Sequence, residues 1–310
     1  MRRHKKMILA LALFGGAVAA LATGAIGLPS QDALPSTNAG GCRIFPANNP
    51  WNQRVDRAPV ARRSGRFVSK LGLGESLMAD FSIPYATVSG SQPKVRVSFE
   101  NRHESDRGPY PIPPNAPVEG GTPDKHVIVL ERDKCRLYEL YNARPINGGA
   151  RWAAGSGAIW NLRSNHLRPR GWTSADAAGL PILPGLARYD EVKRGKIDHA
   201  LRFTAYNIRW NFVYPARHSD GDSGSPDAPP MGTRFRLRRG FDTSGFPPQS
   251  KVILKALKRY GMILADTGAP IQVSGAPSGG WNDDDLGSLT RVKGRDFQAV
   301  DTRRLPKPGR

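Results

Sequence analysis

The sequence predicts a mainly β protein, a single domain with a β-sandwich or jelly-roll-like fold and a few short helices, one near the C-terminus. Three observations support this fold class. Short apolar segments recur along the chain, several with the alternation of β-strands. The chain also contains 27 prolines and 34 glycines, residues that are typical of turns and loops. Only one long segment has the spacing of an amphipathic helix.

The N-terminal 28 residues predict a signal peptide and therefore an exported protein. Residues 1–6, MRRHKK, are cationic, and residues 7–22 form an apolar run that ends in small residues suited to signal peptidase. The alternative is an uncleaved anchor, because residues 7–28 are just long enough to span a bilayer. Several glycines dilute the run, which favours cleavage and a secreted, extracellular product with no membrane span.

The rest of the chain is predicted to form one domain. Residues 29–41, PSQDALPSTNAGG, are small and polar and predict a flexible linker. Residues 42–301 form a single β-rich domain without an internal repeat. Residues 302–310 form a basic tail, which we expect to be frayed.

The first expected strands are residues 94–99, with an alternating pattern, and residues 126–132, a nearly continuous apolar run. Residues 135–141 follow after a charged turn and predict a hairpin with 126–132. Residues 199–205 and 209–216 look like a second pair of neighbouring strands.

Further elements lie in the C-terminal third. Residues 233–239 alternate apolar side chains with arginines and predict a strand. Residues 250–261 predict a helix that Ser250 caps and Gly261 ends. Residues 262–266 predict a short buried strand, and a second short helix is expected to begin at Asn282.

The two cysteines predict one disulfide. An even number of cysteines in an exported chain favours a bond between Cys42 and Cys135. A lipid anchor on Cys42 is the alternative, but the residue lies about twenty positions beyond the apolar run and not directly after it.

The chain is strongly basic, with 46 Lys and Arg, 26 Asp and Glu, and a net charge of +20. Such a surface attracts polyanions, which for an exported protein are acidic wall polymers, uronate glycans or anionic lipid headgroups. Alternatively, the charge serves solubility alone. No nucleic-acid-binding motif is present, and we expect no specific nucleic-acid partner.

His199 and His218 are the first candidate catalytic residues. His199 begins the expected strand 199–205, and His218 follows the end of strand 209–216. If these strands are antiparallel neighbours, both histidines meet at one edge of a sheet. Imidazoles there could act as general acid and base on a glycan. Alternatively, each is a strand-end residue that hydrogen-bonds a backbone carbonyl.

Two carboxylates and two arginines complete the candidate site. Asp266 ends a predicted buried strand, and Glu139 lies on an aromatic-lined strand face, where sandwich-fold glycosidases place their carboxylates. Arg202 and Arg217, expected at the edge that carries the histidines, could bind a uronate or phosphate by paired hydrogen bonds.

Aromatic residues supply the remaining candidate contacts with substrate. Trp172 and Trp210 could stack on sugar rings, although tryptophans more often serve the core. The histidine spacing matches no compact zinc motif, and no phosphate-binding or dinucleotide-binding loop is present. We therefore predict neither a metal nor a cofactor.

One hexamer, GDSGSP at 221–226, resembles the nucleophile loop of trypsin-like serine proteases, with Ser223 as the nucleophile. None of the six histidines has the sequence context that this family requires, and prolines replace the strand that should follow. We therefore interpret the hexamer as a polar turn.

Several longer motifs resemble a group of uncharacterised exported bacterial proteins. They include FPANNPWN, GWTSADAAGLPILPGL, HALRFT and ALKRYGMILAD, and they are spread so that the likeness extends over nearly the whole mature chain. The resemblance implies secretion and a single domain, and it implies no activity, cofactor or catalytic residue.

Two functional hypotheses follow. In the first, a secreted monomeric enzyme cleaves an extracellular or cell-envelope polysaccharide by hydrolysis or by uronate-type elimination. In the second, a non-catalytic module binds a glycan or the anionic envelope through its basic face.

Overall fold

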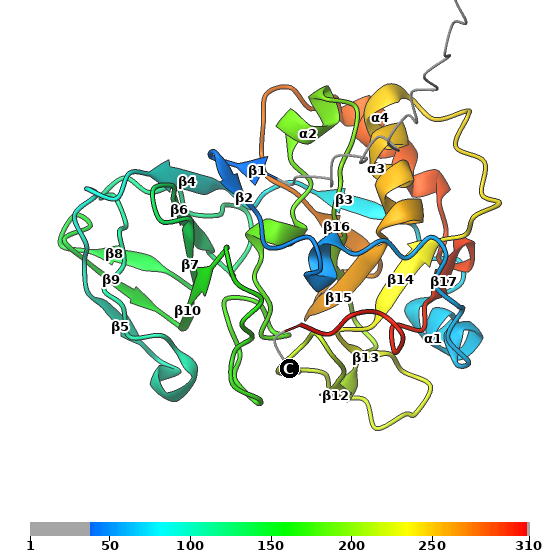
Figure 1. Cartoon of the computed structure of the whole chain (residues 1–310), viewed down its shortest axis with the longest axis horizontal. Helices are drawn as coiled ribbons and strands as arrows, with labels where there is room; N and C mark the ends of the chain where they lie inside the picture. The colour runs from blue at the N-terminus through cyan, green and yellow to red at the C-terminus, as the bar shows by residue number, and fades with distance from the viewer. Residues whose placement is uncertain (1–37, 309–310) are drawn as a thin grey trace, which may run out of the picture. The chain divides into compact units, whose positions relative to one another are not determined.

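The described part of the chain, residues 38–308 of a computed structural model, consists mainly of strands that form five sheets (Figure 1). The predicted mainly β class is confirmed. A single sandwich or jelly roll is not confirmed, because the strands divide among several sheets. The predicted signal peptide, residues 1–28, and most of the predicted linker, 29–41, lie outside the described residues.

The largest sheet is mixed and has six strands. Its two central strands, β15 and β11, run parallel to each other. In spatial order the strands are β17 (Phe297–Ala299), β14 (Arg234–Leu237), β15 (Met262–Thr267), β11 (Leu201–Ala205), β16 (Gln272–Ser274) and β3 (Met78–Asp80).

A four-stranded sheet contains the predicted hairpin, which is confirmed as β6 and β7. Its order is β10 (Ser156–Asn161), β7 (Arg136–Tyr141), β6 (Val127–Glu131) and β4 (Tyr85–Val88). The smaller sheets are β5 (Val97–Phe99), β9 (Arg151–Ala154) and β8 (Arg144–Ile146); β12 (Arg209–Phe212) and β13 (Pro230–Met231); and β1 (Asn38–Ala39) and β2 (Cys42–Arg43).

The helices are short. The α-helices are α1 (Ser64–Leu71), α2 (Tyr189–Lys193), α3 (Pro248–Arg259) and α4 (Asp283–Gly287). Single 3₁₀ turns are η1 (Pro50–Asn52), η2 (Arg102–Glu104), η3 (Leu183–Gly185), η4 (Ser288–Arg291) and η5 (Gly294–Asp296).

The four-stranded sheet is buried on both faces. Ile128 and Leu130 belong to a large core shared with the six-stranded sheet and α3, whereas Val127 and Val129 pack in a second core with β9. Alternation along β6 therefore points successive apolar side chains into one core and then the other. This double burial explains the continuous apolar run, in a strand that pairs antiparallel with β7 and parallel with β4.

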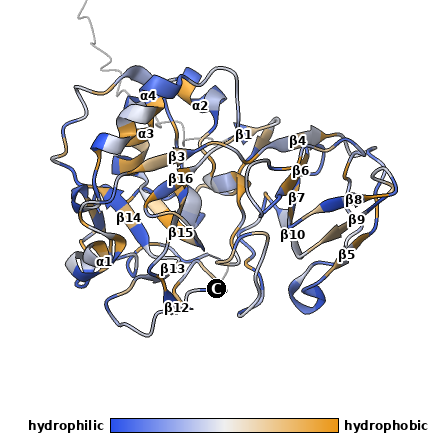
Figure 2. Cartoon of the chain, turned by 180° about the vertical axis from the view of Figure 1, so that it is seen from behind, coloured by the Kyte–Doolittle hydropathy of each residue, from blue (hydrophilic) through white to orange (hydrophobic). Residues whose placement is uncertain are grey.

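Helix α3 lies on the six-stranded sheet and buries the apolar face predicted from its spacing (Figure 2). The helix begins two residues before the predicted start, and Ser250 is not its cap. The carboxylate of Asp285 accepts hydrogen bonds from the backbone N–H of Gln249 (2.8 Å) and of Ser250 (2.8 Å). Asp285 belongs to α4, which the side chain of Asn282 caps as expected, so a distant residue caps α3.

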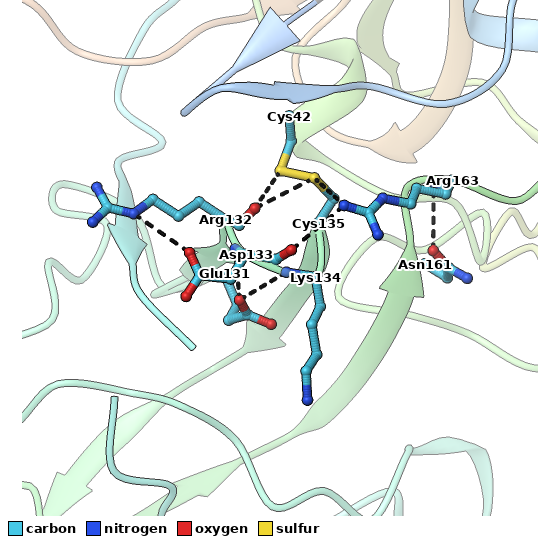
Figure 3. Close-up of a disulfide and its surroundings, with 8 residues drawn as sticks. All are labelled: Cys42, Glu131, Arg132, Asp133, Lys134, Cys135, Asn161 and Arg163. Carbon is cyan, nitrogen blue, oxygen red and sulfur yellow. Dashed lines mark hydrogen bonds and ion pairs between the residues drawn. A yellow bond between two sulfur atoms is a disulfide. The ribbon is translucent and has the colours of Figure 1, made fainter. Parts of the chain in front are cut away.

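The predicted disulfide is confirmed and joins Cys42 in β2 to Cys135 in the turn before β7 (Figure 3). The two Cα atoms are 5.5 Å apart, within the usual range for a disulfide. Glu131 accepts hydrogen bonds from the backbone N–H groups of Asp133 (2.7 Å) and Lys134 (3.0 Å) and so holds the turn that presents Cys135.

Loss of this bond is expected to destabilise the fold. The disulfide closes a loop with a sequence separation of 93 residues, and in the chain-entropy model its removal costs roughly 4 kcal/mol. The variant Cys42→Ser/Cys135→Ser should show this loss in urea denaturation. Reductant should lower the unfolding midpoint of the wild type and leave that of the variant unchanged; an equal midpoint for the two oxidised proteins would contradict the expectation.

Both ends of the predicted domain differ in detail from expectation. Asn38 and Ala39, expected in the linker, pair with β2. The predicted basic tail packs on the body, since the carbonyl of Pro306 accepts a hydrogen bond from Gln53 (2.8 Å) and that of Pro308 accepts one from Tyr214 (2.8 Å). Within residues 38–308, no helix has the length and apolar character needed to span a membrane.

Candidate functional site

A cavity of about 420 Å³, which we call the acidic cleft, opens where several loops meet the end of β15. Five carboxylates line it, and no lysine or arginine does. Its walls come from the end of β7, the β9–β10 connection and loops around residues 173–177 and 218–220. The charged and titratable lining residues are Glu100, Asp124, Tyr141, Asp176, His218, Asp220 and Asp266.

A β-bulge directs Asp266 into this cleft. Phe203 of β11 pairs with Leu264 of β15, but the next residue, Thr204, pairs with Asp266, so Ala265 is an extra residue. Ordinary alternation would place Asp266 on the same face as Leu264, in the core. The bulge moves it to the face of Arg202 and Thr204, as bulges near functional sites commonly do.

Arg202 holds two carboxylates under the cleft. Its guanidinium donates two hydrogen bonds to Asp176, each 2.9 Å long, and one of 2.6 Å to Asp266. A fourth, of 2.6 Å, reaches Ser274 on β16. Arg202 is therefore a positioning residue beneath the cleft. Its guanidinium is occupied by these contacts, so the geometry does not support the predicted role of binding a uronate or phosphate of the substrate.

Asp176 and Asp266 form a carboxyl pair that shares a hydrogen bond. Asp176 is fully buried, and the side chain of Asp266 is 17% exposed, on the cleft side. Burial, and after it the negative charge of Asp176, holds the pKa of Asp266 well above its usual range, although Arg202 opposes the shift. Asp266 thus keeps a proton where an ordinary aspartate has lost it.

His218 lies in the same cleft with one ring nitrogen fixed. Its Nδ1 is 2.7 Å from the carbonyl oxygen of Ala177, which requires that Nδ1 carry the proton in the neutral ring. No residue of 38–308 hydrogen-bonds Nε2, which is left as a proton acceptor. His218 therefore has the tautomer of a general base.

The segment from Thr173 to Gly179 forms one wall of the acidic cleft and carries Asp176 and Ala177, the hydrogen-bond partners of Asp266 and His218. Ser174 Oγ accepts from the backbone N–H of Asp176 (2.9 Å) and also contacts the carbonyl oxygen of Leu180 (2.6 Å), which closes a tight loop. Gly179 has φ +65°, and a Cβ there would lie 2.4 Å from the carbonyl oxygen of Trp172. The small residues of SADAAG thus let the loop approach His218 closely.

The opposite wall offers an aromatic surface. Tyr141 is 39% exposed, and its ring lies over Gly155, where a Cβ would come within 2.9 Å of the ring. On the rim, Thr267 donates a hydrogen bond of 2.6 Å to Asp220. A sugar ring can stack on Tyr141 while its hydroxyl groups meet the carboxylates.

The structure does not bring His199 to the cleft. The expected antiparallel pairing of residues 199–205 with 209–216 is wrong, because β11 pairs with β15 and β16 while β12 pairs with β13. His199 is fully buried, with Nδ1 2.8 Å from the carbonyl oxygen of Ala200 and Nε2 3.1 Å from Glu191. His199 is therefore a strand-end histidine that hydrogen-bonds a backbone carbonyl, which was the alternative interpretation. Of the two candidate histidines, only His218 lines the acidic cleft.

Glu139 is also buried outside the cleft. Its carboxylate accepts hydrogen bonds from the backbone N–H of Ile182 (2.9 Å), the backbone N–H of Leu183 (2.9 Å) and the indole of Trp160 (3.0 Å). Burial raises its pKa to about 7, although these donors oppose the shift. The residue fixes the start of η3 against the four-stranded sheet.

Removal of the Glu139 carboxylate is expected to destabilise the protein. Glu139→Leu leaves three buried donors without an acceptor and should lower the free energy of unfolding by about 3 kcal/mol or more in urea denaturation. The folded pKa lies above the ordinary 4.5, so the native state binds a proton more tightly than the unfolded state. The wild type should therefore lose stability as pH rises from 4.5 to about 7, and Glu139→Gln should lack that slope.

The remaining candidates lie outside the acidic cleft. Arg217 precedes His218, but its side chain lines a different hollow. Trp172 is half-buried, with Arg168 5.5 Å from its ring centre. Trp210 on β12 is 60% exposed and lines neither hollow. Ser223 accepts a hydrogen bond from the backbone N–H of Ser225 (3.2 Å), as in a polar turn.

The sequence prediction included Asp266 and His218 and missed Asp176, Asp220 and the exposed face of Tyr141. Asp176 lies within the SADAAG segment, where serine, aspartate and glycine indicate a tight loop. Its role depends on a contact with Arg202, 26 positions away, which no local pattern shows. Among residues 38–308, no group of three His, Cys, Asp or Glu side chains is placed to hold a metal ion.

Comparisons with family models, with curated proteins and with solved structures find no match for this chain.

Proposed function

We propose that this protein is an exported glycan-cleaving enzyme whose active site is the acidic cleft. The observation that carries the proposal is that one cavity is lined by a proton-retaining carboxyl, Asp266, and by an imidazole, His218, whose Nε2 has no hydrogen-bond partner among residues 38–308. An acid and a base in one solvent-accessible cavity are what cleavage of a glycosidic bond requires.

The reaction that we propose is hydrolysis. Asp266 gives its proton to the glycosidic oxygen as the bond between that oxygen and the anomeric carbon breaks. His218 Nε2 takes a proton from the water whose oxygen bonds to the anomeric carbon. The imidazolium then returns the proton to the solvent, and Asp266 is reprotonated, so the cycle closes without a cofactor.

The charge of the cleft favours hydrolysis over uronate-type elimination. Elimination needs a cation beside the carboxylate of the sugar that loses its proton. Here the guanidinium of Arg202 is held by Asp176 and Asp266, and among residues 38–308 no lysine or arginine lines the cavity. A neutral or amino sugar is therefore the better occupant of the reacting position.

Export is part of the same proposal. The disulfide between Cys42 and Cys135 suits an oxidising compartment, where polysaccharides of the cell envelope and its surroundings are found.

A screen of neutral, amino and acidic polysaccharides tests the proposal. New reducing ends without absorbance of an unsaturated sugar are expected from at least one glycan, since hydrolysis adds water and elimination does not. Unsaturated products would contradict hydrolysis. Binding without any cleavage would instead favour a non-catalytic module.

His218 provides the matching variant test. His218→Gln is expected to lower kcat/KM by about 10²–10⁴-fold, the usual contribution of a general base. His103→Gln, at an exposed histidine outside the cleft, should leave the rate unchanged. His199→Ala should lower thermal stability, but its folded fraction should keep turnover; loss of turnover in a fully folded His199→Ala protein would overturn the assignment.

A further inference from the structure

A second hollow of about 930 Å³, the basic groove, has the opposite charge to the acidic cleft. Seven of its lining residues are lysine or arginine, and one, Asp301, is acidic. The carboxylate of Asp301 is already paired with Arg303 at 2.5 Å. A volume of this size falls within the range of ligand-binding pockets.

Most of the cations in the groove have no carboxylate partner among residues 38–308. Arg62 and Arg170 are exposed, and Lys307 is half-buried. The guanidinium of Arg170 lies 4.6 Å from the ring centre of Phe212, which fixes its position without neutralising it. Arg217 donates from Nε to the carbonyl oxygen of Arg168 (2.8 Å), and its two terminal nitrogens remain for a ligand.

The deepest cation is the most unusual. Arg234 is 3% exposed, and within residues 38–308 its guanidinium hydrogen-bonds only carbonyl oxygens, those of Pro50, Gln53 and Tyr260. A buried charge without an opposite charge is costly, and burial lowers the pKa of Arg234 to about 9. The pKa of Arg217 is also lowered, by burial and then by the charge of Arg170. A bound anion would relieve both effects.

We propose that the basic groove is a binding site for the anionic groups, carboxylate or phosphate, of an acidic polysaccharide. Guanidinium groups bind both anions through paired hydrogen bonds, and the groove presents several at once. The shape of the groove does not select against a neutral ligand. Its unpaired positive charges are what select an anion.

The inference that the polymer is a glycan rests on the proposed function. The inference that the groove binds anions does not rest on it. Arg217 lines the basic groove and the next residue, His218, lines the acidic cleft, so the two hollows are neighbours. Anionic groups are repelled from the acidic side chains of the cleft and attracted to the groove beside it. The matching substrate carries its negative groups on units next to a neutral unit at the scissile bond.

Binding is measured with Asp266→Asn, so that cleavage does not interfere. The probes are oligogalacturonate, which carries carboxylates, phosphorylated malto-oligosaccharide, which carries phosphates, neutral malto-oligosaccharide of matched length and a short single-stranded DNA. We expect at least one of the two anionic polymers to bind more tightly than the neutral oligosaccharide, with an affinity that falls as salt rises.

Two triple variants separate the groove from the general charge of the protein. Arg62→Gln/Arg170→Gln/Lys307→Gln should raise Kd about tenfold or more, since three charge-assisted contacts are lost. The control removes the same charge from exposed positions beside the three-stranded sheet, Lys94→Gln/Arg96→Gln/Arg151→Gln, and should change Kd less than threefold.

Two outcomes overturn the inference, and a third separates it from the proposed function. Equal weakening by both triple variants would show diffuse attraction to a basic surface and no site. Tighter binding of DNA than of either anionic polymer would overturn the assignment to a polysaccharide. If groove-dependent binding is found but wild-type protein cleaves no glycan, the proposed function fails and the anion site stands.

Discussion

Asp266→Asn is expected to lower kcat/KM for glycan hydrolysis by about 10²–10⁴-fold, the range that general acid catalysis contributes. The side chain keeps its size and can still hydrogen-bond Asp176 and Arg202, but the amide cannot transfer a proton to the leaving oxygen. The folded state should therefore survive while the rate falls. Initial rates of reducing-end release at saturating and low substrate measure both kcat and KM.

The pH profile gives the second readout for Asp266. Because its pKa lies well above the ordinary 3.8, the acid should stay protonated over a range where exposed aspartates are ionised, and the rate should fall as pH rises through the raised value. That descending limb should vanish from the residual activity of Asp266→Asn. Asp284→Asn, at an exposed carboxylate in α4, is the matched control and should retain both rate and profile. Full activity in Asp266→Asn would remove the residue from the mechanism.

The largest effect on stability is expected from Arg202→Met, at about 3–5 kcal/mol in the free energy of unfolding at neutral pH. Methionine fills part of the space but leaves Asp176 and Asp266 buried beside each other without their cation. Urea denaturation measures the loss. The exposed pair Arg194–Asp190, at 3.2 Å, supplies the control, and Arg194→Met should cost less than about 1 kcal/mol.

The pH dependence of Arg202→Met has a definite sign. In the wild type, Arg202 favours the ionised form of Asp266, whose pKa lies well above the ordinary 3.8, so this contribution is present above the raised pKa and is lost as pH falls through it. The deficit of the variant should therefore shrink on acidification. The double variant Arg202→Met/Asp176→Asn, which removes one buried charge, should recover part of the stability; no recovery would contradict the buried-charge explanation.

The predictable parts of this protein were those that local patterns determine. The β6–β7 hairpin followed from two apolar runs and a charged turn, and the α3 helix followed from its apolar spacing. The disulfide followed from an even number of cysteines in a chain predicted to be exported. Asp266 followed from its position at the end of a buried strand.

The other parts depended on contacts between distant segments. Consecutive strands usually pair, but β11 is inserted between β15 and β16, which come about sixty residues later, so the two histidines separate. Asp285 caps α3 from another helix, and Asp176 meets Arg202 across the fold. The apolar sequence of a strand such as β6 predicts that both of its faces are buried, but it does not show which sheet covers each face.

The extra residue in β15 also has an evolutionary consequence. A deletion of the single codon for Ala265 would restore regular pairing and leave Asp266 opposite Thr204, on the face of Arg202. A point substitution at Ala265 would instead leave the two-against-one count of the bulge unchanged. A lineage could therefore lose the extra residue in one step without turning the carboxylate of Asp266 away from its arginine.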